Sequence, residues 1–165
     1  MLSCFCENPY AGFKNKQGRD MKFFILTCSL FLLFFCTSGI AMADRVSVSV
    51  PVANIRSGPG GTYTLLWKVE KNHPLEIIKT SGSWYRFRDF EKDEGWIHKS
   101  LVSKTPSIIT IKEKCNVRLA PNTKSDILFI VEKGIPFKII KKKGAWINIE
   151  HADGDKGWIH KKIVW

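Results

Sequence analysis

The sequence predicts an all-β protein made of two small β-barrels in tandem. Residues 54–102 align with residues 116–164 without a gap at an offset of 62, and 20 of the 49 aligned positions are identical. A repeat at a fixed spacing marks a duplicated structural unit. Each copy contains short alternating apolar runs, and no segment of ten or more residues has helical periodicity.

The first 43 residues have the features of a secretory signal peptide. Lys22 precedes an uncharged apolar run at 23–35, and the segment ends on Ala41-Met42-Ala43. A basic start, a short apolar stretch and an A-x-A end mark such a signal. Translation starts either at Met1 or at Met21. We expect cleavage after Ala43 and an extracytoplasmic protein, periplasmic or secreted. The alternatives are an uncleaved membrane anchor and a lipid attached to Cys36.

The mature chain then divides into two copies, expected at 44–103 and 104–165. In the first copy we predict strands at 46–50, 75–78 and 84–88, and in the second strands at 108–111 and 137–140. Tyr85 and Phe87 alternate with charged residues, which predicts one apolar face on that strand. Glycine-rich segments at 57–61, 81–83 and 153–155 predict turns.

Both copies resemble bacterial SH3 (SH3b) domains. The resemblance rests on Asn-Ile-Arg-Ser-Gly-Pro-Gly at 54–60, Gly-x-Trp at 82–84 and Gly-Trp-Ile-His-Lys-Ser-Leu at 95–101. It implies an SH3-like barrel of five to six strands in each copy. It also implies an extracytoplasmic module that binds the cell wall or tethers an enzyme to it.

The resemblance does not extend to the proline-reading groove of eukaryotic SH3 domains. Aligning the closing motif places Trp84 and Trp146 at the groove tryptophan. His98 and His160 then occupy the place of the groove proline, and Leu101 and Ile163 that of its tyrosine. Recognition of proline-rich peptides is therefore not expected.

Two sets of side chains are candidate ligand contacts. In the first set, Trp84 and Trp146 lie on the strand face opposite the apolar one, with Arg86 and Arg88 beside Trp84. They are either exposed anchors for sugar rings or peptides, or rings covered by the following hairpin. Trp96 and Trp158 are expected in the core.

The second set is the lysine run formed by Lys141, Lys142 and Lys143. The chain has 26 Lys+Arg against 15 Asp+Glu, a formal net charge of +11. The run is either a solvated face or a surface that attracts an anionic polymer such as peptidoglycan, or anionic head groups. A nucleic-acid partner is not expected for an exported chain.

No catalytic, metal or cofactor site is predicted. His98 and His160 recur in a barrel-closing turn, where a local hydrogen-bonding role is expected. Cys115 is the only cysteine after residue 43, so it forms neither an internal disulfide nor a paired metal site. It is expected to be a small packed residue. A chain of 165 residues with two barrels also leaves no room for a catalytic domain, so no enzyme is expected.

The sequence thus predicts a secreted, non-catalytic tandem module, expected to be monomeric. Its expected partner is cell-wall material or a cell-envelope protein, with membrane contact only through an uncleaved signal segment. The alternative function is a structural or regulatory module that docks on an envelope enzyme encoded elsewhere.

Overall fold

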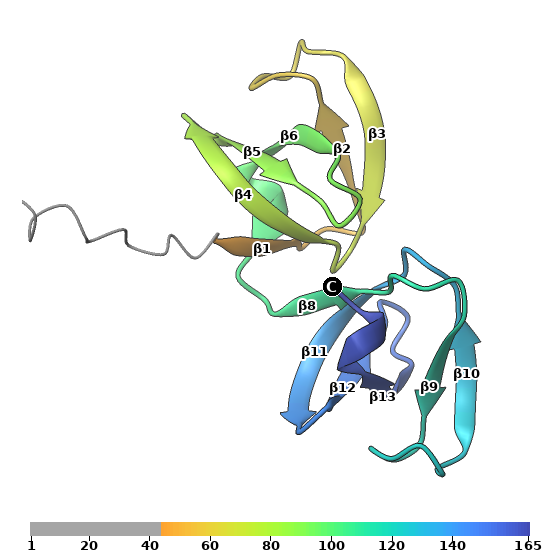
Figure 1. Cartoon of the computed structure of the whole chain (residues 1–165). Helices are drawn as coiled ribbons and strands as arrows, with labels where there is room; N and C mark the ends of the chain where they lie inside the picture. Colours follow the sequence, from red (N-terminus) through yellow and green to blue (C-terminus); the bar gives the residue numbers. More distant parts are fainter. Residues whose placement is uncertain (1–43) are drawn as a thin grey trace, which may run out of the picture. The chain divides into compact units, whose positions relative to one another are not determined.

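The computed structural model describes residues 44–165. Within that range the protein is all-β, apart from two three-residue 3-10 helices, as predicted. The predicted signal peptide and both possible starts fall on residues 1–43, outside the described residues. No helix in residues 44–165 is long and apolar enough to cross a membrane. Figure 1 colours the first copy from orange to green and the second from green to blue.

The first barrel has seven antiparallel strands with the hydrogen-bonded order β3-β2-β6-β5-β4-β1-β7. Its elements are β1 (Arg45–Val48), β2 (Val52–Arg56), β3 (Leu65–Glu70), β4 (Pro74–Ser81), β5 (Trp84–Arg88), β6 (Glu94–His98), η1 (Lys99–Leu101) and β7 (Val102–Ser103). Strands β1 and β7 come from opposite ends of this copy and pair with each other. The ends of the copy are therefore held together.

The second barrel repeats this plan with the order β10-β9-β13-β12-β11-β8. Its elements are β8 (Ser107–Ile109), β9 (Cys115–Arg118), β10 (Ile127–Val131), β11 (Pro136–Lys143), β12 (Trp146–Glu150), β13 (Lys156–His160) and η2 (Lys161–Ile163). A single bridge between Thr110 and Val164 takes the place of the β1–β7 pair. The offset of 62 residues therefore relates the strands of the first barrel to those of the second.

Each barrel is filled by one cluster of buried apolar side chains. Alternation produces these clusters, because every second residue of a strand points inward. The first cluster contains Val46, Val48, Ala53, Ile55, Val69, Leu75, Phe87 and Ile97. The second contains Ile108, Cys115, Val117, Phe137, Ile147, Ile149 and Ile159.

A two-residue turn joins the long hairpin of each barrel. Gly82 begins the turn between β4 and β5, and Gly144 begins the turn between β11 and β12. Their φ angles are +53° and +59°. Tight hairpin turns need positive φ, which glycine adopts without steric cost. These glycines fix the register that places Ser81 opposite Trp84 and Lys143 opposite Trp146.

Candidate functional site

The outer face of strands β5 and β6 collects the polar and aromatic side chains of the first barrel. The register sets three pairs directly opposite one another, namely Trp84 with His98, Arg86 with Trp96, and Arg88 with Glu94. Phe87 and Ile97 lie between them and are fully buried. The predicted alternation of this strand is therefore confirmed, and Trp84 lies on the face opposite Phe87.

Trp84 packs against a histidine rather than standing free. The rings of Trp84 and His98 lie edge to face, with centroids 5.2 Å apart and planes at 83°. Trp146 and His160 repeat the contact at 5.2 Å and 86°. Aromatic pairs favour this geometry because a ring edge is positive and a ring face negative. Both tryptophan rings are half-buried, so they are neither fully exposed anchors nor fully covered rings, the two alternatives that the sequence left open.

The two histidines also cap the 3-10 helices that close the barrels. His98 Nδ1 accepts a hydrogen bond from the backbone N–H of Ser100 at 3.3 Å, and His160 Nδ1 accepts one from Lys162 at 3.3 Å. The expected local hydrogen-bonding role is confirmed. Each histidine thus ties a helix cap to a tryptophan of the outer face.

The prediction that Trp96 and Trp158 are core residues is wrong. Both are half-buried, and it is the neighbouring Ile97 and Ile159 that are fully buried. Alternation decides this, because Ile97 points inward and the residue before it must then point outward. The Gly-Trp-Ile-His pattern could have shown this, since only one apolar residue in it can face the core.

The glycine before each of these tryptophans lets two strands approach closely. A Cβ at Gly95 would collide with Ile55 of β2, and one at Gly157 with Val117 of β9. Glycine at these sites removes that clash. Trp96 then lies diagonally across β5 and β6 from Trp84, at the spacing of neighbouring side chains on one sheet face. We call Trp84 with Trp96, and Trp146 with Trp158, the tryptophan pairs.

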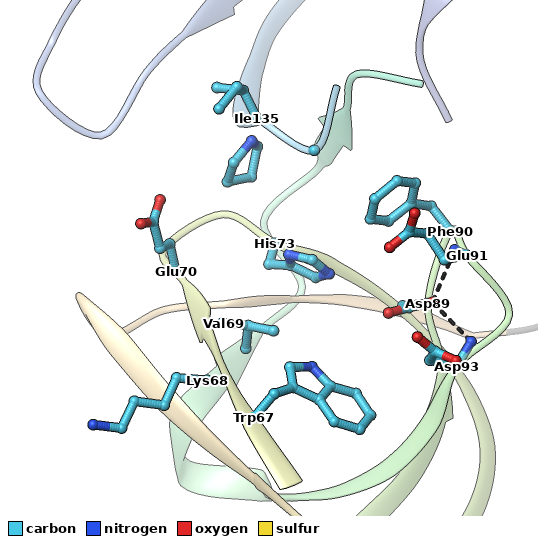
Figure 2. A pocket seen from close by; sticks show the side chains of 12 residues that line it. Trp67, Lys68, Val69, Glu70, His73, Asp89, Phe90, Glu91, Asp93 and Ile135 are labelled. Carbon is cyan, nitrogen blue, oxygen red and sulfur yellow. Dashed lines mark hydrogen bonds between the residues drawn. The ribbon is translucent and has the colours of Figure 1, made fainter. Parts of the chain in front are cut away.

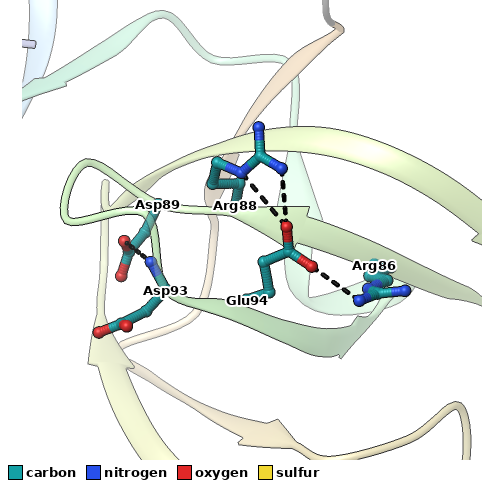
Figure 3. Close-up of polar contacts among 5 residues, drawn as sticks. All are labelled: Arg86, Arg88, Asp89, Asp93 and Glu94. Carbon is teal, nitrogen blue, oxygen red and sulfur yellow. Dashed lines mark hydrogen bonds and ion pairs between the residues drawn. The ribbon is translucent and has the colours of Figure 1, made fainter.

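A carboxylate pairs with both arginines beside the first tryptophan pair. Glu94 accepts hydrogen bonds from Arg86 Nη2 at 2.8 Å and from Arg88 Nη2 at 2.8 Å, as Figure 3 shows. The hydrogen bond from Arg88 is the main cause that lowers the pKa of Glu94. The structure therefore places Arg86 and Arg88 together, as ion-paired groups.

The lysine run of the second barrel is divided between two faces. Lys141 lies opposite Asn148, and Lys143 lies opposite Trp146, on the outer face. Lys142 lies opposite the buried Ile147 and so points to the other side of the strand. Lys141 Nζ lies 5.5 Å from the centre of the Trp158 ring, within the range of a cation–π contact. The run therefore contributes two lysines to the tryptophan face.

The long loop after β2 is tied down by an arginine in each copy. Arg56 Nη1 donates a hydrogen bond to the carbonyl oxygen of Tyr63 at 2.7 Å. Arg118 Nη1 donates one to the carbonyl oxygen of Ser125 at 2.6 Å. Arg56 and Arg118 lie opposite Trp96 and Trp158. The loops that contain Pro59 and Pro121 are thus anchored at the border of the tryptophan face.

A hollow beside β3 holds a buried histidine. Figure 2 shows His73 beside Phe90 and the Asp89 loop, with ring centroids of His73 and Phe90 6.0 Å apart. Burial lowers the pKa of His73 from 6.5 to about 4. Its Nε2 has no hydrogen-bond partner among residues 44–165. Asp89 accepts hydrogen bonds from the backbone N–H groups of Glu91 and Asp93, and burial raises its pKa.

The described part of the chain holds no candidate metal site, and its one cysteine is buried. Residues 44–165 contain no group of three or more His, Cys, Asp or Glu placed to hold a metal ion. Cys115 is fully buried, and its Sγ donates to the carbonyl oxygen of Lys112 at 3.3 Å. Burial raises the pKa of this thiol, which disfavours the reactive thiolate. The prediction of a small packed cysteine is confirmed.

Similar proteins include two that are named as amidases. The putative N-acetylmuramoyl-L-alanine amidase YrvJ of Bacillus subtilis is 25% identical over 160 residues, which cover 88% of this chain and 31% of that protein. The probable cell wall amidase LytH of Staphylococcus epidermidis is 42% identical over 52 residues, which cover 31% of this chain and 18% of that protein. The chain therefore spans about a third or less of the length of these relatives.

Both copies match one family model. Among solved structures, an NlpC/P60 family protein from Bacillus cereus aligns with a TM-score of 0.34 and 10% identity, covering 73% of this chain and 55% of that one. The family model of the bacterial SH3 domain matches residues 49–104 and again residues 112–165. Because these two matches take in more than half of the sequence, the chain belongs to the bacterial SH3 domain family.

Proposed function

We propose that the chain is a secreted, non-catalytic protein that binds peptidoglycan through the outer faces of its two barrels. One observation carries this proposal. Trp84 with Trp96, and Trp146 with Trp158, occupy matched positions on the outer face of both barrels, beside cationic side chains. The relatives' names, a putative N-acetylmuramoyl-L-alanine amidase and a probable cell wall amidase, support the same class of ligand.

The geometry suits a polymer that contains both sugar rings and ionised groups. The rings of a tryptophan pair offer adjacent apolar surfaces on which sugar rings can pack. The exposed lysines and arginines around them attract carboxylates. Two such faces in one chain would also strengthen attachment to a repeating polymer, because the second contact is intramolecular after the first has formed.

The test is sedimentation of the whole purified chain with insoluble peptidoglycan. Trp84→Ala with Trp146→Ala, and separately Trp96→Ala with Trp158→Ala, should each weaken binding by about 1–3 kcal/mol, as expected for aromatic anchors. The matched control is Leu66→Ala with Leu128→Ala, which removes exposed side chains from β3 and β10, the edge strands of their sheets. The control should bind as the unaltered chain does.

Unfolding midpoints of the same variants separate lost binding from lost folding. Each tryptophan variant should remain folded, because the buried clusters do not include these rings. A chain that does not sediment with peptidoglycan at low salt would refute the proposal. Release of soluble fragments from the polymer by the purified chain would refute its non-catalytic part.

Secretion is tested by the N-terminus of the exported protein. Cleavage after Ala43 should give a chain that begins at Asp44 and retains Cys115 as its only cysteine. N-terminal sequencing of the extracytoplasmic form measures this directly. Recovery of an intact 23–35 segment in the membrane fraction would show an uncleaved anchor.

A second candidate function is docking on an envelope protein, and edge strand β10 favours it. Ile127, Leu128 and Ile130 of this strand are 44%, 47% and 50% exposed. β10 pairs only with β9 in its sheet, and an apolar strand with one free edge can accept a strand from another protein. Lys68 occupies the position of Ile130 in the first barrel.

The exchange Ile130→Lys tests this candidate. It should abolish capture of an envelope protein that pairs with β10, while binding to purified peptidoglycan stays unchanged. The reverse result, with polymer binding lost and protein capture kept, would remove β10 from the protein-docking role.

A further inference from the structure

The two tryptophan faces differ in charge at matched positions. The first barrel has Glu76, Ser81, Glu94 and Ser100 where the second has Lys138, Lys143, Lys156 and Lys162. All four of these lysines are exposed. The strands around them keep the same register in both barrels. The duplication has therefore kept the aromatic face and changed the charge that surrounds it.

In the first barrel both arginines of this face are ion-paired with one carboxylate. Glu94 lies between Arg86 and Arg88 and forms an ion pair with each at 2.8 Å. Both arginine side chains are at least 40% exposed, but each already has Glu94 as its ion-pair partner. An anionic ligand would have to compete with Glu94 for these arginines.

In the second barrel the face carries more lysines than carboxylates that could pair with them. Glu150 forms ion pairs with Lys156 at 3.3 Å and with Lys138 at 3.5 Å. Within residues 44–165, no carboxylate lies within ion-pair distance of Lys141, Lys143, Lys161 or Lys162. Lys141 and Lys161 match Lys79 and Lys99, which have no ion pair in the first barrel either. Lys143 and Lys162 are therefore the additional cationic groups that can meet an outside anion.

Several of these free lysines lie around the second tryptophan pair. Lys143 is directly opposite Trp146 across β11 and β12. Lys162 follows His160 by two residues and donates its backbone N–H to the ring that packs on Trp146. Lys141 lies over Trp158. A ligand ring placed on the tryptophan pair would have cationic groups on both sides of it.

We propose that the second barrel, and not the first, recognises the carboxylates of the peptide stems of peptidoglycan. This inference rests on the proposed function and divides it between the barrels. Sugar rings pack on both tryptophan pairs, and only the second barrel adds ionic contacts. Lysine suits this role because its ammonium is a mobile point charge that can meet carboxylates at varied positions along a flexible peptide.

The experiment exchanges residues between the barrels of the whole chain. In one variant, Lys143→Ser and Lys162→Ser give the second barrel the residues of the first at these two positions. This variant should bind peptidoglycan about tenfold more weakly at low salt, and the deficit should vanish at high salt because exposed charges are screened. A control with Lys68→Gln and Lys71→Gln removes the same net charge from exposed sites of the first barrel.

A second arm removes the anion from the polymer. Peptidoglycan whose carboxylates have been converted to amides should bind the unaltered chain and the two-lysine variant equally. Adding Ser81→Lys and Ser100→Lys to that variant should restore most of the lost binding to unmodified peptidoglycan, because the first barrel then carries the two cationic groups. Unfolding midpoints should change little, since each barrel already tolerates the residues that are exchanged.

The outcomes separate this inference from the proposed function. No sedimentation of the unaltered chain refutes the proposed function itself. Sedimentation with equal loss of binding in the two-lysine variant and the control refutes the division between barrels, because net charge alone would explain the loss. Vesicles of anionic phospholipid form the last arm. If the variant loses binding to vesicles but keeps binding to peptidoglycan, the lysines serve a membrane surface and the inference is overturned.

Discussion

The two barrels share strands, register and turns, yet they differ in core, buried polar groups and surface charge. Leu75 and Phe87 in the first core correspond to Phe137 and Ile149 in the second. The phenylalanine of the core therefore lies on β5 in the first barrel and on β11, the counterpart of β4, in the second. His73 corresponds to Ile135. The comparison shows that this fold requires a filled interior and correct turns, and accepts different residues that meet those requirements.

The largest expected difference is sensitivity to acid. Burial holds the pKa of His73 at about 4 in the folded first barrel, against 6.5 for the free side chain. The unfolded chain therefore takes up a proton as pH falls below 6.5, while the folded chain does not until about pH 4. Across that window the first barrel should lose up to about 3 kcal/mol of stability.

The exchange His73→Ile tests this, because the second barrel has isoleucine at the matched position. Urea unfolding at pH 7 and pH 4, resolved by amide exchange in each barrel, measures the effect. His73→Ile should remove the added acid sensitivity of the first barrel. Asp89 is present in both the unaltered chain and the His73→Ile variant, so its raised pKa does not affect the difference in acid sensitivity between them. Equal losses with and without His73 would show that the histidine is not the cause.

The next difference concerns the exchanged core residues. Phe87→Ile alone should leave a void, and Leu75→Phe alone should overfill the first core, each costing about 1–3 kcal/mol. The double variant has the pair of residues found in the second core and should lose less than either single variant. A double-mutant cycle from denaturant unfolding measures the coupling. Additive losses would show that the two positions are filled independently.

A smaller difference is expected at two turns with positive φ. Lys92 has a φ of 77°, whereas the matched residue of the second barrel is Gly154 with a φ of 104°. Lys92→Gly should stabilise the first barrel by about 0.5–1 kcal/mol, because a β-carbon is strained there. Asn72, with a φ of 69°, is the matched control. Asn72→Gly should have a weaker effect, since asparagine tolerates this conformation better than lysine does.

The smallest effect is expected at the outer ion pairs. The positions of cation and carboxylate in these pairs are reversed between the two barrels. Arg88 faces Glu94 in the first barrel, and Glu150 faces Lys156 in the second. Exchanging Arg86→Asn, Arg88→Glu and Glu94→Lys together should leave the thermal midpoint of the first barrel unchanged, because exposed ion pairs contribute little. Arg88→Glu alone should lower the midpoint, since it sets two carboxylates opposite each other.

The candidate site was predictable only in part. The outward positions of Trp84 and Trp146 follow from alternation around Phe87 and Ile149. The positions of Trp96 and Trp158 were missed, because an aromatic residue between glycine and isoleucine was taken for a core residue. The pairing of Arg86 and Arg88 with Glu94 was also missed. It depends on which residue of β6 lies opposite each residue of β5.

The sequence alone determined the duplication, the strand content and the barrel family. These properties depend on local patterns, namely alternation, glycine turns and a repeat at fixed spacing. Only the tertiary structure decided which charges are neutralised and which remain free. Lys141, Lys142 and Lys143 are adjacent in sequence, yet they point to alternate faces and meet different neighbours. Cross-strand register sets those neighbours, and it is fixed by contacts between residues far apart in the chain.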